Sequence, residues 1–360
     1  MNRQQRRQAE RQARKKSVVQ QSKGAVQKSP DETFERHLFG LTTIIQSKIK
    51  IGDKVYGSQG SGFYFTNESL RDPNLTSGQW IKIDGTWLVT NRHVVLPIKD
   101  GKEHLPEEFV FCFREIIDGK IIWKPIPITQ EELRSRLKLH KDKSVDVALI
   151  DVHDYVNELM KDNSKKHILP ALLGNNHLPD NNPIVIDVTS DIVVASYPKG
   201  FYDIVNKFPI VKSGIIASAW KFPFNGQPIF QIDAQLFPGS SGGLVISKPT
   251  NLAYFGGGIN HSKMKEFVLL GVYSGEYIFY EEIDSYGKKQ KIQRSYGLGN
   301  VWYSYLIPQI IKEGITYEGQ SQKQDSAVMN QAELIHQDDC LKELHRKNEA
   351  KKIKGESSKI

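Results

Sequence analysis

The chain has 360 residues, 39% of them hydrophobic and 25% charged, and its formal net charge is +8. These fractions are typical of a soluble globular protein, and no apolar run approaches the roughly 18 residues that are needed to span a bilayer. The two cysteines, Cys112 and Cys340, lie too far apart in the sequence to suggest a disulfide framework or a cysteine zinc site. We therefore expect a cytoplasmic protein that is not inserted in a membrane and carries no metal or other cofactor.

Residues 1–32 form a basic arm ahead of the first predicted strand. Polar residues follow where a signal peptide needs its apolar segment, so export by that route is not predicted. The arm fits a solvated, flexible tail, because no aromatic residues alternate with the charges as a stacking platform requires. Weak contact with nucleic acid or an acidic surface is the second interpretation. The start of the arm contains one acid, Glu10, and the basic residues Arg3, Arg6, Arg7, Arg11, Arg14, Lys15 and Lys16.

The middle of the chain consists of short apolar or alternating runs that are separated by glycine, proline, asparagine and aspartate. Such runs predict β-strands, and they include GSGFYFT, TWLVTNRHVV, EEFVFCFRE, VDVALIDV, DIVVASYP, VKSGIIASAW, QPIFQIDAQ, GGLVIS and FVLLGVYSG. Helical spacing is confined to HDYVNELMKD and VWYSYLIPQIIKEG.

A polar, turn-rich segment at residues 161–182 divides these runs into two groups. The strands are too many for one small barrel. We therefore predict an all-β protein of two antiparallel β-barrels, the first at residues 33–165 and the second, with a closing helix near its C-terminal end, at residues 166–317. Residues 318–360 are predicted to form a polar tail that is helical or disordered.

Three residues in these predicted barrels can carry nucleophilic chemistry. His93 ends one apolar strand and Asp146 begins another, although each position is also ordinary for a turn residue. Ser241 lies in LFPGSSGGLVIS, where the Gly-x-Ser-x-Gly pattern also occurs in the nucleophile turn of α/β hydrolases. In those hydrolases the acid and the histidine follow the serine, whereas this chain has the order His, Asp, Ser of the chymotrypsin type.

Four blocks around these residues resemble the peptidase unit of trypsin-like serine peptidases of the bacterial HtrA/Deg type. They are GSGFYFT, LVTNRHVV with His93, DVALIDV with Asp146, and FQIDAQLFPGSSGGLVIS with Ser241. The resemblance extends from about residue 35 to residue 313 and concerns the peptidase unit only. HtrA proteins usually add a peptide-binding PDZ domain and are exported. We expect neither feature here and carry over no periplasmic quality-control role.

The resemblance implies a serine endopeptidase that hydrolyses protein or peptide substrates. Ser241 is then the nucleophile, His93 the general base, and Asp146 the residue that orients the imidazole. The backbone N–H groups of Gly239 and Ser241 are implied to form the oxyanion hole. Ser240 is implied to be a neighbour of the nucleophile and not a second one.

The same resemblance places a substrate pocket beside the nucleophile, lined by Gln235, Tyr273, Ser274 and Gly275. Gln235 falls near the base of this pocket, where relatives that select lysine or arginine carry an acid. A neutral amide does not compensate a buried cation, so we expect a preference for small or medium uncharged residues. Glu276 lies close enough to complicate this expectation.

Alternative interpretations remain open at this point. One alternative is a catalytically silent binding or adaptor protein that keeps the peptidase fold, and a less favoured one is an esterase. Degenerate peptidases usually lose a triad member or the oxyanion glycine, and this chain has all of them. Asp146 is preferred over Asp142, Asp151 and Asp154 because only Asp146 is followed by the small-residue run VALI. A metal site is not predicted, because no HExxH or comparable ligand pair occurs.

Deletion of residues 1–30 is expected to leave hydrolysis of a small peptide nearly unchanged, because no predicted strand or triad residue lies in the arm. The measurement is kcat/KM of the truncated and the full chain on the same peptide. If the arm binds nucleic acid, the affinity of the full chain falls steeply with salt. Loss of folding on truncation would contradict the assignment of these residues to a tail.

Overall fold

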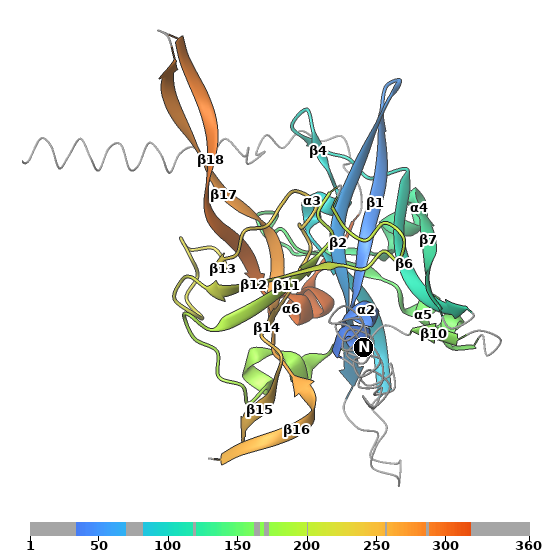
Figure 1. Cartoon of the computed structure of the whole chain (residues 1–360). Coiled ribbons are helices and arrows are strands. Elements are labelled where there is room, and N and C mark those ends of the chain that lie inside the picture. The colour runs from blue at the N-terminus through green and yellow to red at the C-terminus, as the bar shows by residue number, and fades with distance from the viewer. Residues whose placement is uncertain are drawn as a thin grey trace, which may run out of the picture.

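The computed structural model describes residues 34–69, 82–117, 120–161, 166–168, 173–199, 201–255, 258–285 and 288–317. The predicted basic arm and the predicted polar tail both lie outside the described residues. Most of the described chain is β-strand, with few helices, which confirms the predicted all-β class (Figure 1).

The first half of the chain, together with β19 (Ile315–Thr316), builds a nine-stranded antiparallel sheet. Its order is β10-β6-β1-β2-β3-β9-β8-β19, with β7 paired to β6. The short strands β4 (Ile98–Lys99) and β5 (Lys102–Glu103) form a separate hairpin. The strands of the sheet are β1 (Thr42–Ile51), β2 (Lys54–Ser69), β3 (Lys82–Thr90), β6 (Glu108–Ile117), β7 (Lys120–Thr129), β8 (Leu137–Leu139), β9 (Ala148–Asp151), β10 (Lys166–Ile168) and β19 (Ile315–Thr316).

The second half closes into a barrel of order β11-β12-β13-β18-β17-β14. All of its strand pairs are antiparallel. A further hairpin follows β14 and consists of β15 (Thr250–Phe255) and β16 (Gly258–Glu266). The barrel strands are β11 (Asp191–Ser196), β12 (Ile210–Ile216), β13 (Ile229–Asp233), β14 (Leu244–Ser247), β17 (Leu269–Ser285) and β18 (Lys288–Tyr303).

Short helices join the strands. Thr129 and Glu132 form a reciprocal capping box at the start of α4, which satisfies N–H groups that a helix end otherwise leaves unpaired. None of the helices in the described part of the chain combines the length and apolar composition that crossing a membrane requires. The helices are α2 (Phe34–Leu41), α3 (Arg92–Val95), α4 (Gln130–Arg136), α5 (His153–Lys161) and α6 (Leu306–Glu313), with 3₁₀ turns η2 (Asn175–His177) and η3 (Pro179–Asn181).

The second predicted helix is shorter than its sequence pattern indicates. VWYSYLIPQIIKEG predicts a helix from residue 301, but β18 continues to Tyr303 and α6 begins at Leu306. Val301 and Trp302 are buried and pair with both β13 and β17, so barrel closure outweighs the local helical spacing. The helix predicted in HDYVNELMKD is confirmed as α5.

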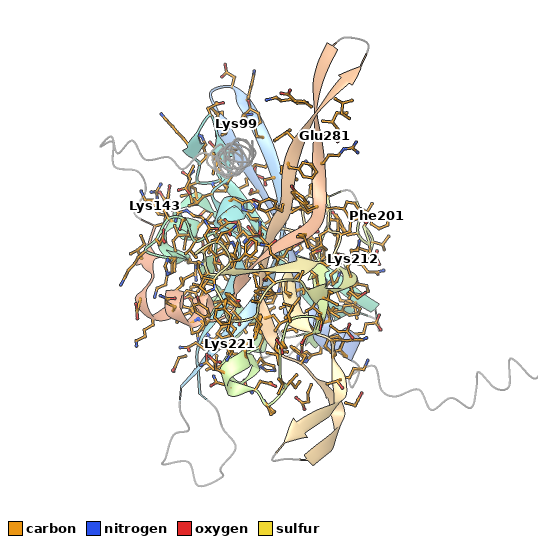
Figure 2. All side chains as sticks on the ribbon, turned by 90° about the vertical axis from the view of Figure 1, so that its left-hand side faces the viewer. Lys99, Lys143, Phe201, Lys212, Lys221 and Glu281 are labelled. Atoms are coloured by element: carbon orange, nitrogen blue, oxygen red, sulfur yellow. The ribbon has the colours of Figure 1, made fainter. Side chains whose placement is uncertain are left out.

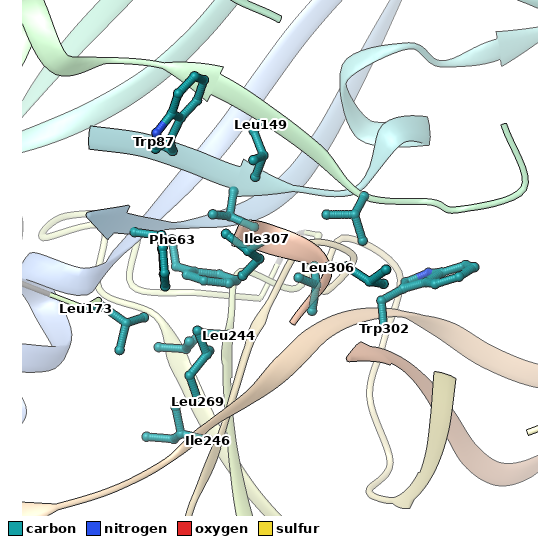
Figure 3. Packing of buried hydrophobic residues seen from close by; sticks show 14 of the residues in the cluster. Phe63, Trp87, Leu149, Leu173, Leu244, Ile246, Leu269, Trp302, Leu306 and Ile307 are labelled. Atoms are coloured by element: carbon teal, nitrogen blue, oxygen red, sulfur yellow. The ribbon is translucent and has the colours of Figure 1, made fainter. Parts of the chain in front are cut away.

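One hydrophobic cluster joins the sheet and the barrel (Figure 3). Phe63 and Leu149 of the sheet pack in the same cluster as Leu244 of the barrel and Ile307 of α6. The chain also crosses back after the barrel, because β19 pairs with β8. β10 pairs with β6 of the sheet, and the predicted boundary at residues 165/166 stays a prediction.

Arg114 of β6 is a buried guanidinium that fastens a loop of the second half to the sheet. It is 2% exposed and donates hydrogen bonds to the carbonyls of Phe39, Asn206 and Lys207 and to the hydroxyl of Tyr197. A buried charge is tolerated only where its hydrogen bonds are satisfied. The bonds to Asn206 and Lys207 therefore hold the loop that contains these residues against the first sheet.

Arg114→Met is expected to lower the free energy of unfolding by about 2 to 4 kcal/mol, because it removes these bonds and leaves polar acceptors without donors. The measurement is denaturant unfolding of both proteins. The matched control is Arg294→Met, which removes an exposed arginine paired with Glu281 and is expected to change stability by about 0.5 kcal/mol or less. Equal effects of the two substitutions would refute the anchoring role of Arg114.

Candidate active site

The pairing of β3 with β9 brings His93 and Asp146 together. Thr90, the last residue of β3, is paired with Ala148, the first residue of β9. His93 follows β3 and Asp146 precedes β9, so both lie at the same end of the strand pair. The Nδ1 atom of His93 is 2.7 Å from Oδ2 of Asp146, and the backbone N–H of His93 donates to Oδ1 at 2.9 Å. The side-chain amide of Asn91 donates to the Asp146 carbonyl at 2.7 Å, which fixes the backbone of both loops.

Ser274 of β17 completes the surroundings of this carboxylate from the barrel side. Its hydroxyl donates to Oδ2 of Asp146 at 2.7 Å. The sequence predicts Ser274 as a substrate-pocket residue and gives no signal of this bond, since a serine inside a strand is ordinary. Only the packing of the barrel on the sheet places the hydroxyl on Asp146.

The two charged partners shift each other's pKa in opposite directions. Burial alone raises the pKa of the Asp146 carboxyl, but the charge of His93 and the hydrogen bonds from His93 and Ser274 outweigh burial and hold that pKa below its usual value. Burial alone lowers the pKa of His93, and the charge and hydrogen bond of Asp146 outweigh it, so the pKa of His93 lies above its usual value. The pair therefore stabilises an imidazolium beside a carboxylate.

The turn that carries Ser241 requires glycine at two positions. Gly239 has φ of 94° and Gly242 has φ of 81°, both in the left-handed region that residues with a Cβ rarely adopt. A Cβ on Gly239 would also lie 2.5 Å from the backbone nitrogen of Lys199. In the part of the chain that the structure describes, the N–H groups of Gly239 and Ser241 donate to no protein acceptor. The turn thus presents two unpaired backbone donors.

Ser61 of β2 holds this turn against the sheet. Its N–H donates to the carbonyl of Ser241 at 2.8 Å, and its hydroxyl donates to the carbonyl of Gly239 at 2.9 Å. The same hydroxyl accepts the N–H of Tyr197 at 2.8 Å, and Thr90 donates its hydroxyl to the Ser61 carbonyl at 2.7 Å. The block GSGFYFT identifies this strand in the sequence, but nothing in it singles out Ser61.

The two serines of the turn have different surroundings. Ser240 is fully buried and accepts a hydrogen bond from the hydroxyl of Ser196 at 3.1 Å. Ser241 is partly exposed, and its hydroxyl donates to the carbonyl of Ser274 at 2.9 Å. The hydroxyl of Ser241 must leave this carbonyl before it can donate to His93.

The predicted pocket residues differ in their exposure. Gln235 is exposed, Ser274 and Gly275 are partly exposed, and Tyr273 is buried in the hydrophobic cluster of the barrel. Burial and the charge of Glu276 raise the pKa of the Tyr273 hydroxyl. Glu276 itself accepts the N–H of Leu236 at 3.2 Å, so its side chain reaches across to the segment that precedes the nucleophile turn.

Among the described residues no group of three or more His, Cys, Asp or Glu side chains is arranged to hold a metal ion.

Residues 60–252 match the family described as trypsin-like peptidase domain. No curated protein matches the sequence. Among solved structures, the chain is similar to a catalytically active tobacco etch virus protease complexed with product, with 8% identity, a TM-score of 0.38, and 83% of this chain and 89% of that chain covered. It is also similar to the scabies mite inactivated protease paralogue S-I1, with 14% identity, a TM-score of 0.36, and 78% and 99% covered. The narrower likeness to HtrA/Deg proteins stays a prediction.

Asp146→Asn is expected to lower the pKa of His93, because the amide keeps the shape of the side chain but removes the charge that opposes burial. The measurement is an NMR titration of the His93 ring. Asp142→Asn, in the exposed part of the same loop, is the matched control and should leave the midpoint unchanged. An unchanged midpoint in Asp146→Asn would show that Asp146 does not determine the charge state of His93.

Proposed function

This chain belongs to the family of trypsin-like peptidases, and from that membership we propose that it is a serine endopeptidase that acts through His93, Asp146 and Ser241. The observation that carries the proposal is a set of hydrogen bonds that connects these three residues through Ser274. Ser274 accepts a hydrogen bond from Ser241 and donates one to Asp146, which in turn contacts Nδ1 of His93. One barrel residue therefore connects the nucleophile turn with the histidine and aspartate of the sheet.

In the proposed reaction Ser241 attacks the carbonyl carbon of the substrate while its proton passes to Nε2 of His93. Asp146 holds Nδ1 and thereby keeps Nε2 unprotonated and directed at the serine before attack. As the imidazolium forms, the raised pKa of His93 reflects the stabilisation that the neighbouring carboxylate supplies. His93 then returns the proton to the leaving amine, the peptide bond breaks, and an acyl-enzyme remains on Ser241. Water activated by His93 releases the acyl group.

The negative charge that develops on the substrate oxygen requires donors that are in position before the reaction. We assign this role to the backbone N–H groups of Gly239 and Ser241, which lack protein acceptors in the described chain. Removal of one such donor typically costs roughly 3 kcal/mol of transition-state stabilisation. The bonds from Ser61 to the carbonyls of Gly239 and Ser241 support this role, because they fix the peptide units next to those that carry the two donors.

The substrate contacts that we propose centre on Ser274 and Gly275, the partly exposed residues of β17 beside the nucleophile turn. Gln235 lines the approach to this region, and Tyr273 supports it from the barrel core. Glu276, which accepts the N–H of Leu236, places a carboxylate in this region. The preference for uncharged residues that the sequence predicts does not take this carboxylate into account.

A catalytically silent binding protein is the second candidate, and one observation favours it. The hydroxyl of Ser241 donates to Ser274, and no hydrogen bond joins Ser241 to His93 among the residues that the structure describes. Catalytic hydrogen bonds are often long or poorly aligned without substrate, so this geometry does not exclude turnover. Covalent labelling of Ser241 distinguishes the two candidates.

Ser241→Ala is expected to abolish hydrolysis of a peptide substrate, with a loss of roughly 10⁶-fold in kcat, and to abolish labelling by a fluorophosphonate probe. Mass spectrometry of the labelled wild-type chain should find the modification on Ser241. Ser240→Ala is the control for the choice of serine and should retain labelling, because the Ser240 hydroxyl is buried against Ser196. Modification of Ser240, or wild-type protein that is folded but neither labelled nor active, would refute the proposal.

A further inference from the structure

The loop between β11 and β12 exposes a group of large apolar side chains. Phe201 is 72% exposed, Ile204 is 69% exposed and Val205 is 85% exposed. Figure 2 shows Phe201 at the outer edge of the molecule, on the same side as Lys212 of β12. Single exposed apolar side chains are ordinary on a protein surface, but a group of them in one short loop indicates an interaction site.

Hydrogen bonds within the loop fix the turn that presents these side chains. The carboxylate of Asp203 accepts the N–H groups of Val205 and Asn206 and the side-chain amide of Asn206, at distances of 3.0, 2.9 and 2.8 Å. The carbonyl of Asp203 accepts the N–H of Lys207 at 2.8 Å. The tip of the loop is therefore a closed turn whose conformation does not depend on its apolar side chains.

The base of the loop is anchored to the first half of the protein. Arg114 of β6 donates to the carbonyls of Asn206 and Lys207. The ring of Phe208 stacks on that of Phe39 in α2, with centroids 3.8 Å apart. Because these contacts hold the loop away from the barrel, its apolar tip stays in solvent and does not fold back to bury itself.

Aromatic and basic side chains adjoin the apolar tip. The ammonium of Lys207 lies 5.0 Å from the ring centroid of Trp123 and 5.2 Å from that of Tyr202. The ammonium of Lys212 lies 5.1 Å from the ring centroid of Phe237. Tryptophan and tyrosine are enriched where proteins meet the boundary between water and the apolar part of a bilayer, because each side chain has an apolar body and a polar group.

The charge around the loop is positive. Lys199 is exposed, and in the described part of the chain no carboxylate forms an ion pair with Lys199, Lys207 or Lys212. The helix α2, which contacts the loop through Phe39, follows residues 1–32. These residues include nine lysines and arginines and three aspartates and glutamates, a net +6 of the +8 of the whole chain. Such a concentration of positive charge favours an anionic surface as the partner.

The size of the tip favours a lipid surface over a folded protein partner. A specific protein interface buries about 800 Å² on each side, which a tip of three side chains does not supply. The boundary between the headgroups and the acyl chains of a bilayer accepts apolar side chains to a depth of about 5 to 10 Å. Burial of apolar area and attraction to anionic lipids both contribute to binding there.

We propose that the loop between β11 and β12 docks this protein on the surface of an anionic lipid bilayer. The side chains of Phe201, Ile204 and Val205 enter the boundary between headgroups and acyl chains. Lys199 and Lys212 contact the lipid phosphates. Such docking requires no membrane-spanning segment, and it does not depend on the proposed peptidase function.

The docking loop borders the candidate active site. The N–H of Lys199 donates to the carbonyl of Pro238 at 2.8 Å, and Pro238 directly precedes Gly239 of the nucleophile turn. Docking through this loop therefore holds the nucleophile turn close to the lipid surface.

The test measures co-sedimentation of the full chain with two kinds of vesicle, one of phosphatidylcholine and one of equal parts of phosphatidylcholine and phosphatidylglycerol. We expect binding to the anionic vesicles to be about tenfold stronger or more, and to weaken as salt is added. The triple substitution Phe201→Ser, Ile204→Ser and Val205→Ser should weaken binding to the anionic vesicles about tenfold or more, because it removes the apolar area that enters the bilayer.

The matched control is the double substitution Val185→Ser with Phe222→Ser, which changes similarly exposed apolar side chains in other loops. Lys221, the neighbour of Phe222, lies well away from Phe201 in Figure 2. The control variant should bind the anionic vesicles as the wild type does. Denaturant unfolding should show the stability of the wild type for both variants, because the replaced side chains are exposed.

A label at the tip reports whether the loop enters the bilayer. Val205→Cys in a Cys340→Ser background can be labelled with the environment-sensitive NBD group, because Cys112 is buried. The NBD fluorescence should rise and shift to shorter wavelength on anionic vesicles, and lipids that carry a spin label on the acyl chain should quench it. The same label at Val185→Cys should not respond.

Equal binding of the anionic vesicles by the wild type and the triple variant, or an unresponsive label at residue 205, would refute docking through this loop. Equal affinity for both kinds of vesicle, or binding to neither, would also refute the inference. If vesicles are not bound and the triple substitution raises KM for a soluble peptide or abolishes a concentration-dependent dimer, substrate or a second copy covers the loop instead. Vesicle binding is measured without hydrolysis, so a failure of the proposed peptidase function leaves this inference standing.

Discussion

The carboxylate of Asp146, whose side chain is 21% exposed, constrains how the two halves of this protein pack. A charge removed from water must be compensated by hydrogen bonds and opposite charge, and Asp146 obtains these from both sides of the interface. His93 supplies a backbone N–H and the imidazole from the sheet, and Ser274 supplies a hydroxyl from the barrel. A shift of the barrel against the sheet would break the bond from Ser274 and leave the carboxylate partly unsatisfied.

The remaining contacts between the halves act together with this one. The hydrophobic cluster that the sheet, the barrel and α6 share holds the barrel against the sheet. The pairing of β19 with β8 of the sheet adds a second connection. Ser61 then holds the nucleophile turn through bonds to two of its carbonyls. Because hydrophobic contact is not directional, it brings the halves together, whereas the hydrogen bonds of Asp146 and Ser61 set the geometry of the site.

β17 connects the barrel wall with the candidate active site. Its first residues form the barrel wall, Ser274 contacts Asp146 and Ser241, and its outer part pairs with β18. Sites carried on regular strands are held more precisely than sites on loops, which suits a reaction that depends on close positioning of the attacked carbonyl.

The sequence by itself determined the all-β class, the strands around His93, Asp146 and Ser241, and the glycine positions of the nucleophile turn, because strand alternation and left-handed backbone are local properties. It did not indicate the bond from Ser274 to Asp146 or the bonds from Ser61 to the turn that carries Ser241. It also predicted a helix where Val301 and Trp302 close the barrel. Which face a strand serine or tyrosine presents, and what lies opposite it, depends on the pairing of strands far apart in the chain. Only the tertiary structure therefore decided that Ser274 donates to Asp146 and that Tyr273 packs in the barrel core.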